Sequence, residues 1–431
     1  MANKMGFWPV YAIVLGSQIG SGVFMLPSGL APYGYFSALG WLLAGFGAVS
    51  LAMVFVALVA RVPKTGGPHA FVAAAFSSPV LTFFTGWTYW LISALSTVTV
   101  IASSISYLSP FLPDVTPQAS AFYQLVVLAV FVWINLQGVS SAGRVEVVLM
   151  IVKILTLTVI PLYALGYFNG QHFQVSAVLS DQSGWVLLGR TTMLAFWGFI
   201  GLETATTPAE SVANPKVTIP IALIVGTLSV MLLYLLNSVS IQGLISPNVL
   251  SVSQAPYTDA VKIIWGGSWY LALAVMAALI FLSNLNAWLL TCGQVALGLA
   301  NDGYLPAVFQ KVNRRGSPYW GLLVSACFMV PLILSTLDSN VAKQVELIIE
   351  LSVAAFIYVY IICTFGLLNL LLKEARPWYY HGYLSIAVSL VFLVMMLVSS
   401  ESVILLTSGA FVLSGLPLYV FWYRSPMISR T

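Results

Sequence analysis

Three ionisable residues, Glu203, Lys153 and Glu350, stand inside long apolar runs of this sequence. Inside a membrane-spanning helix such a residue costs roughly 2.5–3.5 kcal/mol on insertion scales, so each must serve a function or a structural need. A carboxylate in apolar surroundings, such as Glu203, could carry a proton or sense the charge of a substrate. Its alternative role is a structural hydrogen bond to loose backbone nearby.

Lys153 and Glu350 each have two interpretations. The long stem of Lys153 could carry its charge back to the membrane surface. Alternatively, the ammonium is a fixed or titratable charge inside a helical bundle, where it would make a sodium ion unnecessary. Glu350 follows Glu346 by one turn, so the pair could mark a helix end, or Glu350 could face a cavity and attract cationic substrates. Glu146 is expected to form a local ion pair with Arg144.

Two of the apolar runs carry glycines near their centres, in segments 16–24 and 196–204. Glycine weakens a helix by about 1 kcal/mol relative to alanine and lets backbone approach a ligand closely. Within lipid, a broken helix is tolerated only where protein or a wet cavity covers its free amides and carbonyls. The alternative is helix packing, since Gly16 and Gly20 have the spacing of a small-xxx-small contact. Because the breaks fall in the first and sixth runs, as two inverted five-helix repeats require, they are predicted to form a substrate site.

Two tryptophans, Trp197 and Trp288, lie near the centres of apolar runs. Tryptophan more often anchors a helix end at the membrane interface. Near the centre of a span, its ring can close over a substrate or stack on a cationic group. Trp197 adjoins a glycine break and is predicted to be a gate, whereas Trp288 fits a gate and a packing residue equally well.

The composition places these residues in a membrane protein. Of the 431 residues, 60% are hydrophobic and 6% are charged, whereas a soluble domain has about 25% charged residues. A bilayer can accommodate such a chain because lipid solvates apolar side chains directly. The first apolar run continues past spanning length, so we expect a retained helix rather than a cleaved signal peptide.

A spanning helix needs about 20 mostly apolar residues. The sequence contains twelve such runs, which predict an all-α integral membrane protein with short loops and no separate soluble domain. The predicted spans are 7–31, 36–60, 79–109, 120–138, 146–168, 184–211, 218–243, 268–299, 318–337, 345–372, 379–399 and 402–423.

Basic residues predict the orientation of these spans. With both termini on one side, that side receives twelve of the 16 basic residues, and the opposite side receives only Arg190, Lys262 and Lys343. Cytoplasmic loops are enriched in Lys and Arg, so both termini are predicted to be cytoplasmic. The net charge of +4 therefore reflects topology, and no nucleic-acid partner is expected.

The sequence offers no motif for a cofactor or a covalent mechanism. The histidines, His69, His172 and His381, lie far apart, and the 3 cysteines fit neither a disulfide framework nor a zinc site. Neither a nucleophile elbow nor a nucleotide-binding loop is present. We therefore expect no metal, no cofactor, no enzymatic activity and no ATP-driven pump.

Several motifs resemble those of the amino acid–polyamine–organocation (APC) superfamily of transporters. They are GSGVF at 20–24, PKTGGPHAF at 63–71, WGFIGLE at 197–203, AESVANPK at 209–216, IPIA at 219–222 and NDGYLP at 301–306. These motifs span most of the chain in the expected order. The chain is most similar to the bacterial arginine/agmatine and putrescine/ornithine antiporter group.

The resemblance implies a LeuT-like fold with twelve transmembrane helices in one transporter domain, 1–431. A five-plus-five inverted repeat would occupy 7–168 and 184–372, and two additional helices would occupy 379–423. Helices one and six would be broken at the midplane of the membrane. Members of the superfamily are often homodimers.

The resemblance also implies roles for individual residues. Residues 19–22 would meet the substrate carboxylate, and the backbone of 197–200 would meet its amino group. Trp197 would be the gate, Glu203 the proton-linked carboxylate, and Lys153 the residue that replaces sodium. The predicted substrate-binding residues are Gln18, Ile19, Gly20, Ser21, Gly22, Trp197, Gly198, Phe199, Ile200, Gly201, Trp288 and Glu350.

This sequence departs from the arginine/agmatine exchangers at several predicted pocket positions. Ser17 and Gln18 replace the residues typical before the glycines, and Glu350 falls near a small hydroxyl residue of those exchangers. The third-span segment 93–96 also differs. The motifs therefore predict the transporter class without naming the substrate.

Together, these observations predict a sodium-independent secondary transporter of amino acids or related amines in the inner (plasma) membrane, working by alternating access. An antiporter is the first expectation, and a proton-coupled symporter is the alternative. A channel or a non-transporting membrane sensor is the alternative from a different class, although a sensor would usually carry a soluble output domain.

Overall fold

The computed structural model describes residues 4–112, 116–253, 255–335, 341–374, 380–399 and 402–423. The side chains of Ser21 and of residues 341–351 are among those not described. In the described residues the fold is all-helical, and β-type pairing is confined to one bridge between Met5 and Val212. The predicted all-α class is therefore confirmed.

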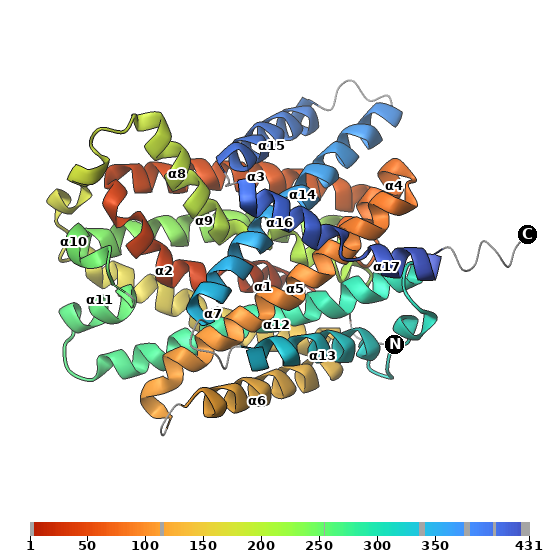
Figure 1. Ribbon diagram of the computed structural model, residues 1–431, viewed down its shortest axis with the longest axis horizontal. Helices are drawn as coiled ribbons and strands as arrows, with labels where there is room; N and C mark the ends of the chain where they lie inside the picture. Colours follow the sequence, from red (N-terminus) through yellow and green to blue (C-terminus); the bar gives the residue numbers. More distant parts are fainter. Residues whose placement is uncertain are drawn as a thin grey trace, which may run out of the picture.

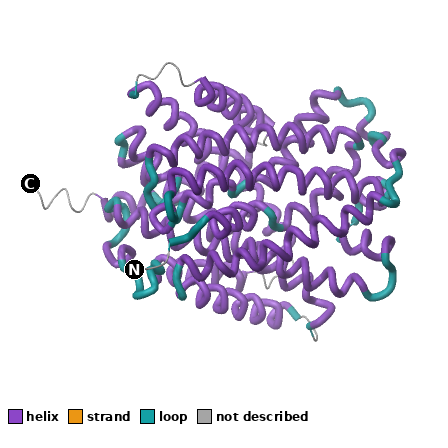
Figure 2. Tube along the Cα trace, turned by 180° about the vertical axis from the view of Figure 1, so that it is seen from behind, coloured by secondary structure: helices purple, strands orange, loops and turns teal. Residues whose placement is uncertain are grey.

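Long helices run side by side through the bundle (Figures 1 and 2). The α-helices are α1 (Phe7–Gln18), α2 (Ser21–Leu30), α3 (Tyr35–Arg61), α4 (Pro68–Phe76), α5 (Pro79–Leu108), α6 (Pro117–Leu136), α7 (Val139–Leu165), α8 (Gly184–Phe196), α9 (Pro215–Leu244), α10 (Pro247–Leu250), α11 (Pro256–Ile264), α12 (Trp269–Asn301), α13 (Tyr319–Ser335), α14 (Val341–Lys373), α15 (Tyr380–Ser399), α16 (Ser402–Leu413) and α17 (Leu416–Leu418). The 3-10 turns η5 (Trp197–Phe199), η6 (Leu202–Thr206) and η7 (Ala209–Ser211) continue from α8.

The number of spanning helices is slightly smaller than predicted. Within the described residues, 10 helices are long and apolar enough to cross a membrane, and the bent pair α1 and α2 makes up to 11. The remaining predicted span, 318–337, contains α13, which has only 17 residues and ends where the chain is no longer described. Multi-pass membrane insertion thus follows from the structure, whereas a count of twelve does not.

Helix α7 illustrates how the sequence produces this bundle. Its outward face carries exposed apolar side chains, among them Val148, Ile151 and Leu155. Its charged residues Glu146 and Lys153 are fully buried on the other side. Seven residues make about two helical turns, so these two lie on one face. A helix with an apolar exterior and a polar interior suits lipid surroundings, since water would not tolerate so large an exposed apolar surface.

The centre of the bundle contains the segments that carry the predicted site. In Figure 1, α1, α5 and α12 lie between the edge helices α6 and α15. Every residue of α1 from Val10 to Gln18 is buried. The broken end of α1 is therefore enclosed by protein, as a broken helix in lipid requires.

Hydrogen bonds join loops that the predicted spans place on the same side of the membrane. At one end, Met5 donates to the Ser211 carbonyl at 2.8 Å, and Gly66 donates to the Thr207 carbonyl at 2.9 Å. At the other end, Ser176 donates to the Pro32 carbonyl at 2.9 Å. These contacts agree with the alternation of the predicted spans.

Candidate functional site

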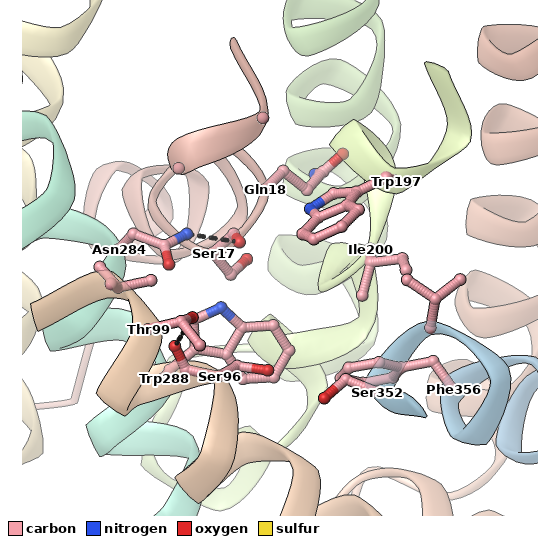
Figure 3. Close-up of a pocket in the computed structure, with 14 residues that line it drawn as sticks. Ser17, Gln18, Ser96, Thr99, Trp197, Ile200, Asn284, Trp288, Ser352 and Phe356 are labelled. Carbon is pink, nitrogen blue, oxygen red and sulfur yellow. Dashed lines mark hydrogen bonds between the residues drawn. The ribbon is translucent and has the colours of Figure 1, made fainter. Parts of the chain in front are cut away.

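A polar cavity lies between the two glycine-containing breaks (Figure 3). Side chains and backbone from α1, α2, α5, η5, α12 and α14 converge on it. The residues that line it are Ser17, Gln18, Gly20, Gly22, Ser96, Thr99, Val100, Trp197, Ile200, Asn284, Trp288, Ser352, Val353 and Phe356.

The first span is interrupted between α1 and α2. Helix α1 ends at Gln18, because Ile19 takes an extended conformation with φ −83° and ψ 99°. After Gly20, α2 continues in a direction that differs by 41°. The break thus leaves carbonyls at the end of α1 and amides at the start of α2 without helical partners.

The free carbonyls of α1 are bound by side chains from three other helices. Asn284 of α12 donates to the carbonyls of Gly16 and Ser17 at 2.9 and 2.8 Å. Tyr234 of α9 donates to the Gln18 carbonyl at 2.9 Å. These bonds satisfy the broken helix without help from a ligand.

The ammonium of Lys153 is the third partner of this helix end. Its Nζ donates to the carbonyls of Leu15, Gly16 and Ile19 at 3.4, 3.2 and 2.7 Å. A cation is favourable here because the partial negative charge of a helix lies at its C-terminus. The structure therefore contradicts the alternative in which Lys153 reaches back to the membrane surface.

The start of α2 has the opposite character. Gly20 and Gly22 line the cavity there, and α2 is 10 residues long. Glycines leave the backbone accessible, and the N-terminus of a helix attracts anions. A carboxylate of a bound molecule would find its natural partner at this end of the cavity.

The sixth span is interrupted directly after α8. Trp197–Phe199 form a 3-10 turn, Ile200 is extended, and Gly201 has a φ of 101°. A Cβ atom at Gly201 would lie 2.8 Å from Cζ2 of Trp288. Both the positive φ and the close ring therefore require glycine at this position.

The two breaks are hydrogen-bonded to each other. Ser17 of α1 donates to the Gly201 carbonyl at 2.8 Å. Thr204 of η6 donates to the Ser17 hydroxyl at 2.7 Å. The end of α1 and the segment after the second break are thus joined as one unit beside the cavity.

Glu203 is fully buried next to this unit and joins three segments. Tyr89 of α5 donates to one of its carboxylate oxygens at 2.7 Å, and Tyr360 of α14 donates to the other at 2.6 Å. The Gly201 amide in turn donates to the Tyr360 hydroxyl at 3.2 Å. The carboxylate therefore connects the second break to α5 and α14 without facing the cavity.

About half of the predicted binding residues line the cavity. Those that do are Gln18, Gly20, Gly22, Trp197, Ile200 and Trp288. Phe199 is instead packed against Trp41 and Tyr234. Ile19, Gly198 and Gly201 belong to the two breaks but do not line the cavity. The side chains of Ser21 and Glu350 lie outside the described residues.

Polar residues on three straight helices complete the lining. Ser96 and Thr99 come from α5, Asn284 from α12, and Ser352 from α14. Ser96 belongs to the third-span segment singled out above, whereas its neighbour Ser93 bonds to the Tyr89 carbonyl. Asn284 carried a usable signal in the sequence, because it stands in a polar Ser-Asn-Leu-Asn run, 283–286, inside an apolar span.

Aromatic side chains form one wall of the cavity. The ring of Trp288 lies 5.5 Å from that of Phe356 and 6.4 Å from that of Tyr89, between ring centroids. Trp197 is only half-buried and lies beside Gln18 in Figure 3. Trp288 is therefore enclosed by aromatic neighbours, whereas Trp197 is less buried.

The expected ion pair between Glu146 and Arg144 is wrong. Glu146 is fully buried and accepts hydrogen bonds from Ser283 and Asn286 of α12. The reason is the start of α7 at Val139, because Gly138 with a φ of 111° ends the preceding turn. Glu146 therefore lies two turns inside the helix rather than at its end.

A break in each of two spans, beside a shared cavity and within an apolar helical bundle, is typical of a membrane carrier. More particularly, the chain belongs to the amino acid permease family, whose model matches residues 5–423. It is a secondary transporter of the APC superfamily, not an enzyme.

Curated relatives are similar over most of their length. A cadaverine/lysine antiporter of Escherichia coli strain K12 is 27% identical over 81% of this chain and 79% of its own. A putrescine transporter of Haemophilus influenzae is 25% identical over 86% of each chain. A putrescine transporter of Escherichia coli strain K12 is 26% identical over 84% of this chain and 82% of its own.

Proposed function

We propose that the protein exchanges amino acids or related amines across the inner (plasma) membrane by alternating access, without sodium. The observation that carries this proposal is the position of Lys153, whose ammonium binds three carbonyls at the broken end of α1. Carbonyl groups freed by a broken helix are where such carriers coordinate a cation. With a fixed ammonium in that place, no sodium ion is needed to complete the site.

The substrate would bind between the two breaks with its charged groups at opposite ends. The carboxylate of an amino acid substrate would meet the amides at the start of α2, near Gly20 and Gly22. Its amino group would meet the backbone of 197–200, where α-helical bonding is interrupted. The named relatives carry amines or a basic amino acid, which supports this substrate class.

Four side chains would contribute to access, substrate binding and coupling. Trp197 would close over the substrate, while Trp288 would form the wall on which the substrate side chain rests. Glu203 would exchange its proton as the state changes, since its two tyrosine partners lie on α5 and α14, and the segment of Glu203 would move relative to these helices. Glu350 remains the candidate for attracting a cationic group, three residues before the cavity residue Val353 on α14.

The proposed architecture has twelve spans, with inverted repeats at 7–168 and 184–372 followed by two helices at 379–423. Termini on the cytoplasmic side are supported by the twelve basic residues on that side. The bundle that contains the first and sixth spans would rock against the rest. A homodimer is proposed because members of the superfamily are often homodimers.

Counterflow in proteoliposomes tests the proposal. Vesicles preloaded with unlabelled amino acids and amines are offered labelled lysine, ornithine, putrescine, cadaverine or alanine singly, in sodium-free buffer. The proposal expects saturable uptake that requires internal substrate. Uptake that is neither saturable nor stimulated by internal substrate would indicate a channel and contradict the proposal.

Proton-coupled symport is the second candidate, favoured by the buried carboxylate of Glu203. In that case empty vesicles accumulate substrate when only a proton gradient is imposed. Exchange predicts no accumulation in empty vesicles. The same preparation therefore separates the two mechanisms.

A further inference from the structure

The buried charge of Glu146 has no role in the mechanism given so far. Lys153 and Glu146 are both fully buried on one face of α7. Burying a carboxylate costs free energy unless hydrogen bonds and an opposite charge compensate it. The hydrogen bonds from Ser283 and Asn286 alone could be accepted by a neutral glutamine, so the carboxylate itself calls for an explanation.

Gly16 separates the two charges. Lys153 donates to the carbonyl of Gly16 on one side. On the other side, a Cβ atom at Gly16 would overlap the carboxylate of Glu146. Among the described residues no ion pair joins Lys153 and Glu146, so the end of α1 lies between them.

The two charges are attached to different parts of the bundle. All backbone partners of Lys153 belong to the end of α1. The side-chain partners of Glu146, Ser283 and Asn286, belong to α12. Asn286 is fixed in turn by Asn135 of α6, at 3.1 Å. Glu146 is therefore anchored to straight helices, whereas Lys153 is attached to the interrupted one.

We propose that Glu146 is the counter-charge that holds Lys153 when α1 shifts during transport. This proposal rests on the proposed alternating-access function. If α1 withdraws its carbonyls, the ammonium is left buried without partners, and the nearest anion on its own helix face is Glu146. A direct Lys153–Glu146 pair then stabilises the state in which α1 has shifted. When α1 returns, Lys153 leaves Glu146 and binds the carbonyls of α1 again. Glu146 is thus a positioning residue that acts through Lys153.

The test compares Glu146→Gln, Lys153→Gln and the double variant in counterflow. Each single change leaves one buried charge without its partner, so the maximal rate should fall by about tenfold or more. KM should change by less than about threefold, because neither side chain lines the cavity. The double variant should be no slower than the slower single variant, since no charge is then left uncompensated.

Two further variants separate charge from packing. Ser283→Ala removes one hydrogen bond but keeps the carboxylate, so its rate should fall less than that of Glu146→Gln. Glu210→Gln changes an exposed glutamate on η7 and should transport as the wild type does. A double variant whose loss equals the product of the two single losses would overturn the proposal, and so would a wild-type rate for Glu146→Gln.

Thermal unfolding of the same variants tests the counter-charge separately from the proposed transport function. The two buried charges lie on either side of Gly16 and attract each other across it without direct contact. The effects of the two single changes on the unfolding temperature should therefore be non-additive, whether or not the protein transports the tested compounds. Additive effects would overturn the counter-charge. Absence of counterflow in the wild type would instead count against the proposed function.

Discussion

The hydroxyl of Ser17 donates a 2.8 Å hydrogen bond to the carbonyl of Gly201, which ties the break of the first span to the break of the sixth. Thr204 extends this connection by donating to Ser17 at 2.7 Å. A shift of α1 must therefore carry the segment after α8 with it or break these bonds. This coupling offers a physical reason for the two interrupted spans to move as one bundle.

Gly201→Ala is expected to destabilise this connection. Its φ of 101° and the Trp288 ring 2.8 Å from the position of a Cβ atom both exclude a side chain. Left-handed backbone and overpacking together cost roughly 2–5 kcal/mol. The unfolding temperature and the counterflow rate should both fall. Gly29→Ala is the control, because a Cβ atom there meets open space, and equal behaviour of the two variants would contradict the argument.

Glu203→Gln is expected to remove the pH dependence of transport. The two carboxylate oxygens accept from Tyr89 and Tyr360 at 2.7 and 2.6 Å. A glutamine accepts at only one position, donates at the other, and cannot change charge with pH. Counterflow measured from acidic to alkaline pH should give a lower and flatter profile. Tyr360→Phe keeps the carboxyl group and should retain a pH-dependent profile, whereas an unchanged profile in Glu203→Gln would exclude the proton role.

Trp197→Ala is expected to weaken substrate binding by about tenfold in KM, since a desolvated aromatic ring over an ammonium contributes on the order of 1–2 kcal/mol. The half-buried ring lines the cavity beside the second break. Initial rates over a range of substrate concentrations measure the effect. Trp133→Ala is the matched control, since this ring is 62% exposed on the outside of α6. Equal KM values for the two variants would argue against the gate.

The sequence predicted the spans and the breaks better than the cavity walls. Apolar runs show a spanning helix because both lipid and the interior of the bundle favour apolar side chains, and glycine pairs show where backbone is exposed. On straight helices such as α5 and α14, however, lipid-facing and cavity-facing residues are similarly apolar. Val353 and Phe356 therefore gave no signal in the sequence. Thr99 gave none either, because threonines such as Thr85 recur along α5 and bond to carbonyls of their own helix.

Partners that depend on tertiary packing could not be predicted either. Tyr89 and Tyr360 lie far from Glu203 in the sequence, and only the assembled bundle brings them to its carboxylate. Glu146 was misplaced for a different reason. The apolar run that predicts the fifth span begins at residue 146, so Glu146 was placed at a helix end. The helix α7 begins earlier, at Val139, with a first turn that includes the polar residues Ser140 and Ser141.

Replacement of sodium by choline on both sides of the vesicles should leave the wild-type counterflow rate unchanged. A sodium site needs several oxygen ligands in reach of one point. At the end of α1 the carbonyls of Leu15, Gly16 and Ile19 are occupied by the Lys153 ammonium. A rate that falls in choline and recovers with added sodium would contradict the role proposed for Lys153.

The contact between His69 and Asp302 predicts a pH-dependent contribution to stability at the end of α12. Nε2 of the buried His69 lies 3.5 Å from Oδ2 of Asp302. The contact with His69 is the main cause that lowers the pKa of Asp302 below its usual range; burial opposes it, and the charge of Lys64 adds to it. A carboxyl group whose pKa is lowered by folding stabilises the protein above its unfolded pKa of about 3.9, and this contribution is lost as the pH falls through the folded value.

Asp302→Asn should therefore lower the unfolding temperature at neutral pH, and its difference from the wild type should shrink as the pH falls below about 4. Thermal unfolding in detergent over a pH series measures this difference. Asp181→Asn is the control, because Asp181 is exposed in the loop before α8, and it should match the wild type throughout. A deficit of Asp302→Asn that persists undiminished at the acidic end would mean that the side chain acts by packing. A variant as stable as the wild type at neutral pH would mean that the contact with His69 contributes nothing.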